Sequence, residues 1–240
     1  MSKIKKILII IIIIVCIISL IIVSYIFVKA YLEYNSNNED ITELVDKVFI
    51  EDTSDKENKI DWNYLKNINK DIVGWIEIEG TTISYPILQD SSNLYYLKHN
   101  YLKKYNNNGS IFTLDKQPFN NNETLIYGHN MSNGTMFSTL GKYLDKDFFY
   151  SHQKIKIYTP NKNYEGVIFS AYSIGIEEEK ANISNLSFKE KIEYYKKSSN
   201  VRLDNIQTTD KIIKLSTCSY INSRTRPTDQ RYYIIATLNK

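Results

Sequence analysis

The stretch IIKLSTCSY, residues 212–220, is an apolar run that ends in Ser216, Thr217 and Cys218. Isoleucines and a leucine bounded by polar segments are typical of a buried β-strand. A cysteine at the end of such a strand is presented at the rim of a domain, where binding and catalytic side chains are often found. The role of this cysteine depends on the compartment in which the segment lies.

The beginning of the chain predicts a membrane anchor. Lys3, Lys5 and Lys6 precede a nearly continuous apolar run over residues 7–28. A bilayer core needs about 20 apolar helical residues, so this run is long enough to span it. A cleaved signal peptide is the alternative, but its apolar region is normally about 7–15 residues and ends in a small-x-small cleavage site. The stretch FVKAYLEY offers no good site of this kind, and we therefore expect an uncleaved anchor.

Charge predicts the orientation of the chain across the membrane. Residues 1–6 carry only positive charge, whereas residues 29–58 carry nine Asp or Glu against three Lys. Positive flanks stay in the cytoplasm, so we expect a single-pass protein of the cell membrane with its N-terminus inside and its bulk outside. The chain then divides into a cytoplasmic N-terminus (1–6), a transmembrane signal anchor (7–28), an acidic stalk or N-terminal helix (29–58) and one folded domain (59–240).

Cysteine usage leaves two interpretations of Cys218 open. Cys16 lies inside the apolar run, so Cys218 is the only cysteine in the exported part. A lone exported thiol indicates intermolecular pairing or a reactive group, whereas a buried cysteine can also act as a small hydrophobic side chain. The exported domain is mildly basic and lacks the cluster of Lys and Arg that nucleic-acid binding requires, so we expect no nucleic-acid partner.

Alternating apolar and polar residues predict many short strands. IVGWIEIEG (72–80) alternates up to Gly80, and TTISYPILQ (81–89) follows after a tight turn, with Pro86 at an edge or bulged position. Further strands are predicted at 110–114, 124–128, 154–159, 164–174, 211–218 and 231–238, and helices at 40–50, 61–69, 136–143 and 188–197. Many short strands with few helices favour a mainly β fold, a closed or nearly closed barrel.

One of the three histidines stands out. His99 lies in a polar stretch and His152 just before a predicted strand, and we interpret both as structural or solvated. His129 directly follows the strand TLIYG. A strand-terminal His and the strand-terminal Cys218 can form an acid/base and nucleophile pair, because imidazole activates a thiol and later protonates a leaving amine. Their positions in the sequence do not show that they meet.

Arg231 is a third candidate, because it opens the apolar stretch RYYIIATL (231–238). Acyl transfer through a thiol builds negative charge on a carbonyl oxygen, which a fixed guanidinium stabilises. A surface arginine at a strand start is the alternative. The sequence has no C-x-x-C, no H-E-x-x-H and no glycine-rich phosphate loop, so we expect no metal and no cofactor.

Together these stretches resemble the sortases, and class B sortases in particular. The resemblance covers about residues 60–240 and the type of N-terminal anchor. It is carried by six segments in family order: VGWIEIEGTTISYPILQ, NLYYLKHNY, GSIFTLD, TLIYGHNMSNGTMFSTLGKY, LSTC and RYYIIATL. Six ordered segments ending in His, Cys and Arg are far more specific than any one of them alone.

The resemblance implies an eight-stranded sortase-type β-barrel with N-terminal helices and a long helix before the cysteine strand. It implies a membrane-anchored cysteine transpeptidase of Gram-positive bacteria, with residues 59–240 as the catalytic domain. In the matching positions, Cys218 is the nucleophile, His129 the general acid/base and Arg231 the stabiliser of oxyanion and substrate.

The implied substrates are secreted surface proteins with a C-terminal sorting motif of the form N/S-P-x-T-N/G. The enzyme would cleave after Thr through a thioacyl-enzyme and transfer the protein to an amino group of peptidoglycan, either a cross-bridge or a stem peptide. Five residues match substrate-binding segments of the family: Ser216, Thr217, Asn93, Tyr96 and Leu97.

Two points stay open in the sequence. Twelve residues separate Cys218 from Arg231, a few more than we expect in class B, and they contain Arg224 and Arg226. Arg231 is favoured because it alone leads directly into the terminal apolar strand. The alternative activity is an exported cysteine peptidase or cell-wall hydrolase that uses water, although such hydrolases usually place Cys before His. A tethered adhesin with a structural Cys218 is a third possibility.

Overall fold

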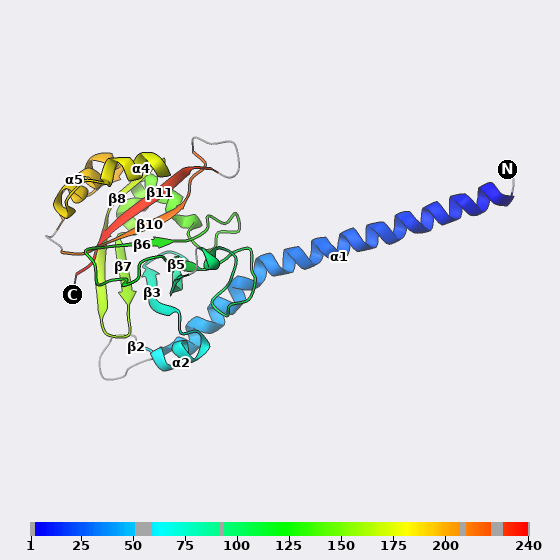
Figure 1. The fold of residues 1–240 in the computed structure, drawn as a ribbon, viewed down its shortest axis with the longest axis horizontal. Coiled ribbons are helices and arrows are strands. Elements are labelled where there is room, and N and C mark those ends of the chain that lie inside the picture. Colours follow the sequence, from blue (N-terminus) through cyan, green and yellow to red (C-terminus); the bar gives the residue numbers. More distant parts are fainter. Residues whose placement is uncertain (1–2, 51–58, 92–93, 207–209, 222–227, 240) are drawn as a thin grey trace. The chain divides into compact units, whose positions relative to one another are not determined.

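The computed structural model describes residues 3–50, 59–91, 94–206, 210–221 and 228–239 (Figure 1). The chain divides into two compact units, Met1–Asp40 and Ile41–Lys240. The described part of the first unit is helical and belongs to α1 (Lys3–Val48). Its segment Lys3–Leu32 contains an 18-residue stretch with a mean hydropathy of 3.7. By length and composition this segment suits a membrane span, and a signal sequence would meet the same criteria.

The second unit is built on a closed β-barrel (Figure 1). Neighbouring strands pair in the order β11-β10-β6-β5-β4-β3-β7-β8, and β11 also pairs with β8, which closes a ring of eight strands. Closure removes the unpaired edges of a sheet. The predicted eight-stranded barrel is thus confirmed. Its strands are β3 (Ile72–Ile78), β4 (Ser84–Gln89), β5 (Ile111–Thr113), β6 (Glu123–Tyr127), β7 (Lys154–Tyr158), β8 (Asn163–Gly175), β10 (Ile212–Cys218) and β11 (Gln230–Thr237).

The ladders explain how Pro86 fits into an internal strand. β4 lies between β3 and β5, and Pro86 is the register partner of Trp75 on β3. The parallel ladder of β4 with β5 begins only at Ile87. Proline lacks a backbone donor, and Pro86 stands just beyond the end of that second ladder. The opposing strand β3 shifts register between Ile72 and Gly74, as at a β-bulge.

Helices and short accessory strands fill the connections. They are α2 (Trp62–Ile68), η1 (Tyr95–Leu97, 3₁₀), η2 (Ser138–Leu144, 3₁₀), α3 (Lys146–Ser151), α4 (Ile176–Ile183), α5 (Phe188–Ser198), the ladder of β1 (Phe49–Ile50) with β2 (Lys59–Ile60), and β9 (Val201–Arg202), which pairs with β8. Asp61 caps α2, accepting a 2.9 Å hydrogen bond from the Tyr64 backbone N–H. The helix predicted at 136–143 is a 3₁₀ helix that begins later, because Met136 has a φ of 54°.

Three apolar clusters hold the second unit together. The barrel interior contains inward-facing residues such as Ile76, Ile126 and Ile234. A second cluster packs Leu44 and Val48 of α1 and Leu65 of α2 against Trp75. A third lies between the barrel and α5, and contains Phe169, Tyr172, Tyr195, Ile212, Tyr233 and Ile235. The outer surfaces of β8, β10 and β11 are therefore covered by the helices that precede the cysteine strand (Figure 1).

Candidate active site

The ends of β10 and β11 bring two predicted site residues together. These antiparallel strands pair Cys218 directly with Arg231. Ile213 and Leu215 point into the barrel, whereas Ile212 belongs to the outer cluster. Because side chains alternate along a strand, Cys218 lies on the outer face together with Lys214 and Ser216. The Cys218 side chain is half-buried and forms no disulfide.

His129 reaches the same level from the neighbouring strand. β6 runs parallel to β10, with Tyr127 opposite Ser216, and the backbone N–H of Gly128 donates to the Ser216 carbonyl at 3.2 Å. His129 lies two residues beyond the end of β6, at the level of Cys218, the last residue of β10. The Asn130 amide then donates a 2.7 Å hydrogen bond to the Cys218 carbonyl. The three residues that the sequence singled out thus meet at one end of three adjacent strands.

Gly128, directly before His129, is closely surrounded by side chains of the barrel interior. A Cβ atom at this position would stand 2.5 Å from the Ile111 side chain and 2.7 Å from the Phe137 ring. Real Cβ contacts are not this short, so with a larger residue here the Ile111 and Phe137 side chains, or the chain beside His129, would have to shift. The close packing around the position directly before His129 therefore favours glycine.

The His129 ring is half-buried and is held by main-chain atoms. Its Nε2 lies 2.8 Å from the Leu97 carbonyl oxygen, at the end of η1. Its own carbonyl accepts a 2.9 Å hydrogen bond from the Phe137 backbone N–H. The other two histidines lie elsewhere: His99 stacks on Tyr95 with ring centroids 3.7 Å apart, and His152 stacks on Phe148 at 4.0 Å. This agrees with their interpretation as structural residues.

The Arg231 side chain is half-buried and oriented by backbone. Its Nη1 donates to the carbonyl oxygens of Thr228 and Gln230, each at 2.8 Å. Its positive charge lowers the pKa of Tyr127 and of Tyr233, although burial, the larger effect, raises both. Arg231 therefore acts electrostatically on the same outer face as Cys218. Arg224 and Arg226, the alternatives in the sequence, lie outside the described residues.

The predicted substrate-binding residues have varied surroundings. Ser216 and Thr217 are 3% and 2% exposed, and Tyr96 is 1% exposed, so these side chains lie inside the protein. Leu97 is half-buried, and Asn93 lies outside the described residues. Among the described residues, the Thr217 hydroxyl is buried without a hydrogen-bond partner.

A buried ion pair that the sequence analysis missed lies on the same face as the cysteine. Lys214 of β10 is paired with Glu179 of α4, and both side chains are almost completely buried. Lys214 also stands over the rings of Tyr195 and Tyr233, 4.7 and 4.2 Å from their centroids. The Tyr172 hydroxyl donates to Glu179 at 2.7 Å. The sequence feature that could have indicated this buried ion pair is the lysine in the middle of the apolar run IIKLSTC.

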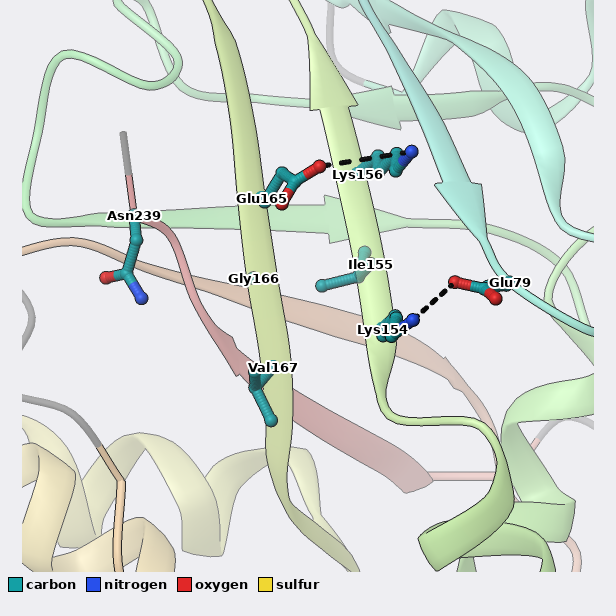
Figure 2. Close-up of a pocket in the computed structure, with 8 residues that line it drawn as sticks. All are labelled: Glu79, Lys154, Ile155, Lys156, Glu165, Gly166, Val167 and Asn239. Carbon is teal, nitrogen blue, oxygen red and sulfur yellow. Dashed lines mark ion pairs between the residues drawn. The ribbon is translucent and has the colours of Figure 1, made fainter. Parts of the chain in front are cut away.

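A separate hollow over β7 and β8 is shown in Figure 2. It is bounded by two exposed ion pairs, Lys154–Glu79 at 3.5 Å and Lys156–Glu165 at 3.9 Å. None of its lining residues is a predicted site residue. Within the described part of the chain, no three His, Cys, Asp or Glu side chains gather as a metal-ligand group.

The geometry suits acyl transfer. A half-buried thiol, an imidazole and a guanidinium are carried by neighbouring chain segments at the ends of β10, β6 and β11. A thiolate can attack a carbonyl carbon, an imidazole can move the proton, and a guanidinium can stabilise the oxygen that gains charge.

Comparison with known proteins identifies the relatives of this chain. A family model described as the sortase domain matches residues 76–239, more than half of the chain. Sortase B of Listeria monocytogenes is 37% identical over 197 residues, which are 77% of this chain and 79% of that protein. The structure of sortase B from B. anthracis has a TM-score of 0.70 at 29% identity, over 88% of this chain and 99% of that one. A Staphylococcus aureus sortase B–substrate complex has a TM-score of 0.66 at 29% identity, over 75% and 84% of the two chains.

Proposed function

Because this chain belongs to the sortase family, and within it to the class B sortases, we propose that Cys218, His129 and Arg231 are the catalytic residues of its cysteine transpeptidase activity. The observation that carries this proposal is the convergence at the strand ends: Cys218 pairs with Arg231 across one ladder, and His129 extends the parallel strand on the other side.

The first half-reaction breaks a peptide bond. The Cys218 thiolate adds to the carbonyl carbon of the threonine in the sorting motif, and Arg231 stabilises the oxygen that becomes negative. His129 gives its proton to the departing amine as the C–N bond breaks. The product is a thioester between Cys218 and the threonine, and the released C-terminal fragment carries the new amino group.

The second half-reaction forms a new amide. An acceptor amine attacks the thioester, His129 takes the proton that this amine loses, and the Cys218 thiolate leaves. We propose that the acceptor is an amino group of peptidoglycan, on a cross-bridge or a stem peptide, and that the donor motif has the form N/S-P-x-T-N/G. Sortases act on sorting-signal substrates and an amine, and the specific motif and acceptor extend that general activity.

We propose that residues 7–28 remain as an uncleaved anchor, with residues 1–6 in the cytoplasm and the catalytic domain (59–240) outside, joined by residues 29–58. The apolar helix and the three N-terminal lysines support this arrangement. Tethering holds the enzyme near membrane-bound substrates and raises their effective concentration. Intact-mass measurement of the protein extracted from membranes tests it: loss of the first 28 or so residues would show a cleaved signal sequence instead.

A ligation assay tests the activity itself. The full chain in detergent is incubated with peptides of the form N/S-P-x-T-N/G, with and without triglycine or a stem peptide that carries a side-chain amine. We expect an amide-linked product whose yield depends on the amine. Efficient hydrolysis with no ligated product at any amine concentration would favour the cysteine peptidase alternative.

A further inference from the structure

The hydrogen bond of His129 defines which ring nitrogen carries a proton. Nε2 lies 2.8 Å from the Leu97 carbonyl oxygen. A carbonyl oxygen can only accept a hydrogen bond, so Nε2 must be the donor and must be protonated. In the neutral ring the second nitrogen, Nδ1, is then the acceptor. Nδ1 is consequently the only ring position that can gain and lose a proton while this hydrogen bond is kept.

The other two histidines have the opposite arrangement. His99 meets the Tyr95 carbonyl through Nδ1 at 2.8 Å, and His152 meets the Phe148 carbonyl through Nδ1 at 2.9 Å. By the same reasoning both carry their proton on Nδ1 when neutral. His129 is thus the one histidine of the chain with a backbone-fixed Nε2–H, and the other two provide an internal reference.

The backbone of Gly109 packs closely against the Leu97 carbonyl. Gly109 has a φ of +59°, which favours glycine. A Cβ added there would lie 2.7 Å from the Leu97 carbonyl oxygen and 2.6 Å from that of Tyr96. Both neighbours are backbone atoms, so they could yield only if η1 moved. Any residue larger than glycine would therefore displace the oxygen that orients His129.

The buried Tyr96 anchors the other side of η1. Its backbone N–H donates to Asp90 at 3.1 Å, and its carbonyl accepts from the Ser110 N–H at 2.9 Å. Its hydroxyl donates to Asp71 at 2.6 Å and accepts from the Asn69 amide at 3.0 Å. The carbonyl of the next residue is thus fixed by contacts on several sides, in a segment where sequence resemblance had suggested only substrate contacts.

We propose that the Leu97 carbonyl, positioned by Gly109 and Tyr96, locks His129 in the Nε2–H tautomer, so that Nδ1 performs the proton transfers of the reaction. This rests on the proposed function, in which His129 is the acid/base group. Nδ1 takes the proton of the Cys218 thiol as the thiolate forms and passes it to the departing amine. It then takes a proton from the incoming amine as the new amide forms and returns it to the Cys218 sulfur, while Nε2–H stays bonded to Leu97.

The tautomer can be observed directly. The full chain is labelled with ¹⁵N-histidine and studied in detergent micelles by NMR, and the three rings are assigned with His99→Gln and His152→Gln variants. At a pH where the rings are neutral, we expect an Nε2–H ring for His129 and Nδ1–H rings for the other two. An Nδ1–H ring for His129 would overturn the proposal.

Gly109→Ala tests the positioning role, with Gly134→Ala as the matched control. Both glycines have positive φ, but a Cβ at Gly134 has no atom within 4 Å. Small displacements of a catalytic group can cost up to about a hundredfold in rate. We expect Gly109→Ala to lower kcat about ten- to a hundredfold with little change in KM and to mix the His129 tautomers, and Gly134→Ala to do neither. An unchanged tautomer and an unchanged kcat in Gly109→Ala would contradict the proposal.

Tyr96→Phe provides a milder second variant, because it keeps the buried ring and removes only the hydroxyl. We expect a smaller loss of kcat and a partial tautomer change. A different result would contradict the proposed function. If His129→Ala kept full transpeptidase activity, His129 would not be the acid/base group, whereas an Nε2–H tautomer observed in the wild-type ring would remain valid.

Discussion

Cys218 and Arg231 are register partners across the β10–β11 ladder, so their side chains lie next to each other on the same face of the sheet. In the proposed mechanism, this places the Arg231 charge beside the carbonyl carbon that the Cys218 thiolate attacks. Arg231→Ala should lower kcat about 10²- to 10³-fold, as removal of an oxyanion stabiliser does. Arg231→Lys should recover only part of the rate, because an ammonium does not reproduce the guanidinium's fixed fork of donors. Steady-state ligation kinetics provide the measurement.

Control arginines make the assignment specific. Arg202→Ala removes an exposed arginine of β9 that pairs with Asp204 at 2.8 Å, and should leave kcat unchanged. Arg224→Ala and Arg226→Ala test the alternatives in the loop after the cysteine. Wild-type kcat in Arg231→Ala together with a large loss in either loop variant would move the role away from Arg231.

The buried pair Lys214–Glu179 should behave as a unit in stability measurements. Burial lowers the pKa of Lys214, against the effect of Glu179, which raises it. Removing one partner leaves a buried unpaired charge, so Lys214→Met or Glu179→Gln should each lower the free energy of unfolding by about 3–5 kcal/mol. The double variant should lose clearly less than the sum of the two. Urea unfolding of the full chain in detergent measures all four proteins, and strictly additive losses would show that the pair is not coupled.

Asp71 should contribute stability that is lost in acid. Burial raises its pKa, but hydrogen bonds from Lys103 and Tyr96 outweigh this effect and hold the pKa below its usual value. A carboxyl with a lowered folded-state pKa stabilises the fold above its unfolded pKa of about 4, and this contribution disappears as the pH falls through the folded value.

The comparison of wild type with Asp71→Asn tests this sign. The difference in unfolding free energy should be present at neutral pH and shrink as the pH falls below about 4. Glu178→Gln, which removes an exposed carboxylate of α4, is the control for the effect of losing any one surface carboxylate. A difference between wild type and Asp71→Asn that stays constant with pH would show that the lowered pKa does not contribute.

Most strands could be predicted because the apolar pattern that indicates each strand lies within its own short stretch of sequence. The alternation in IVGWIEIEG and the apolar runs at 212–218 and 231–238 identified β3, β10 and β11 to within about two residues. The short helices α3 and α4 were missed, although Asp145 gives α3 a local N-cap by accepting a hydrogen bond from the Phe148 backbone N–H. Glu179 of α4 is buried where it meets Lys214 of a distant strand and the hydroxyls of Tyr172 and Tyr194.

The sequence predicted which residues belong to the candidate site, but it did not predict how they are arranged in space. That His129, Cys218 and Arg231 stand at strand ends follows from the sequence, but their meeting depends on β6 and β10 being parallel neighbours. The contact of His129 with Leu97 involves a backbone carbonyl, which leaves no mark in the residue pattern. Tyr96 and Leu97 attracted attention only through family resemblance.

The most direct test of the central claim is the mass of the acyl-enzyme. The full chain is incubated with a peptide of the form N/S-P-x-T-N/G without amine, quenched in acid, and mapped by mass spectrometry. We expect the threonine-terminated fragment on Cys218, no adduct in Cys218→Ala, and transfer of the fragment to triglycine or a stem-peptide amine when it is added. Cleavage of the peptide by Cys218→Ala at the wild-type rate, or an adduct on another residue, would contradict the account.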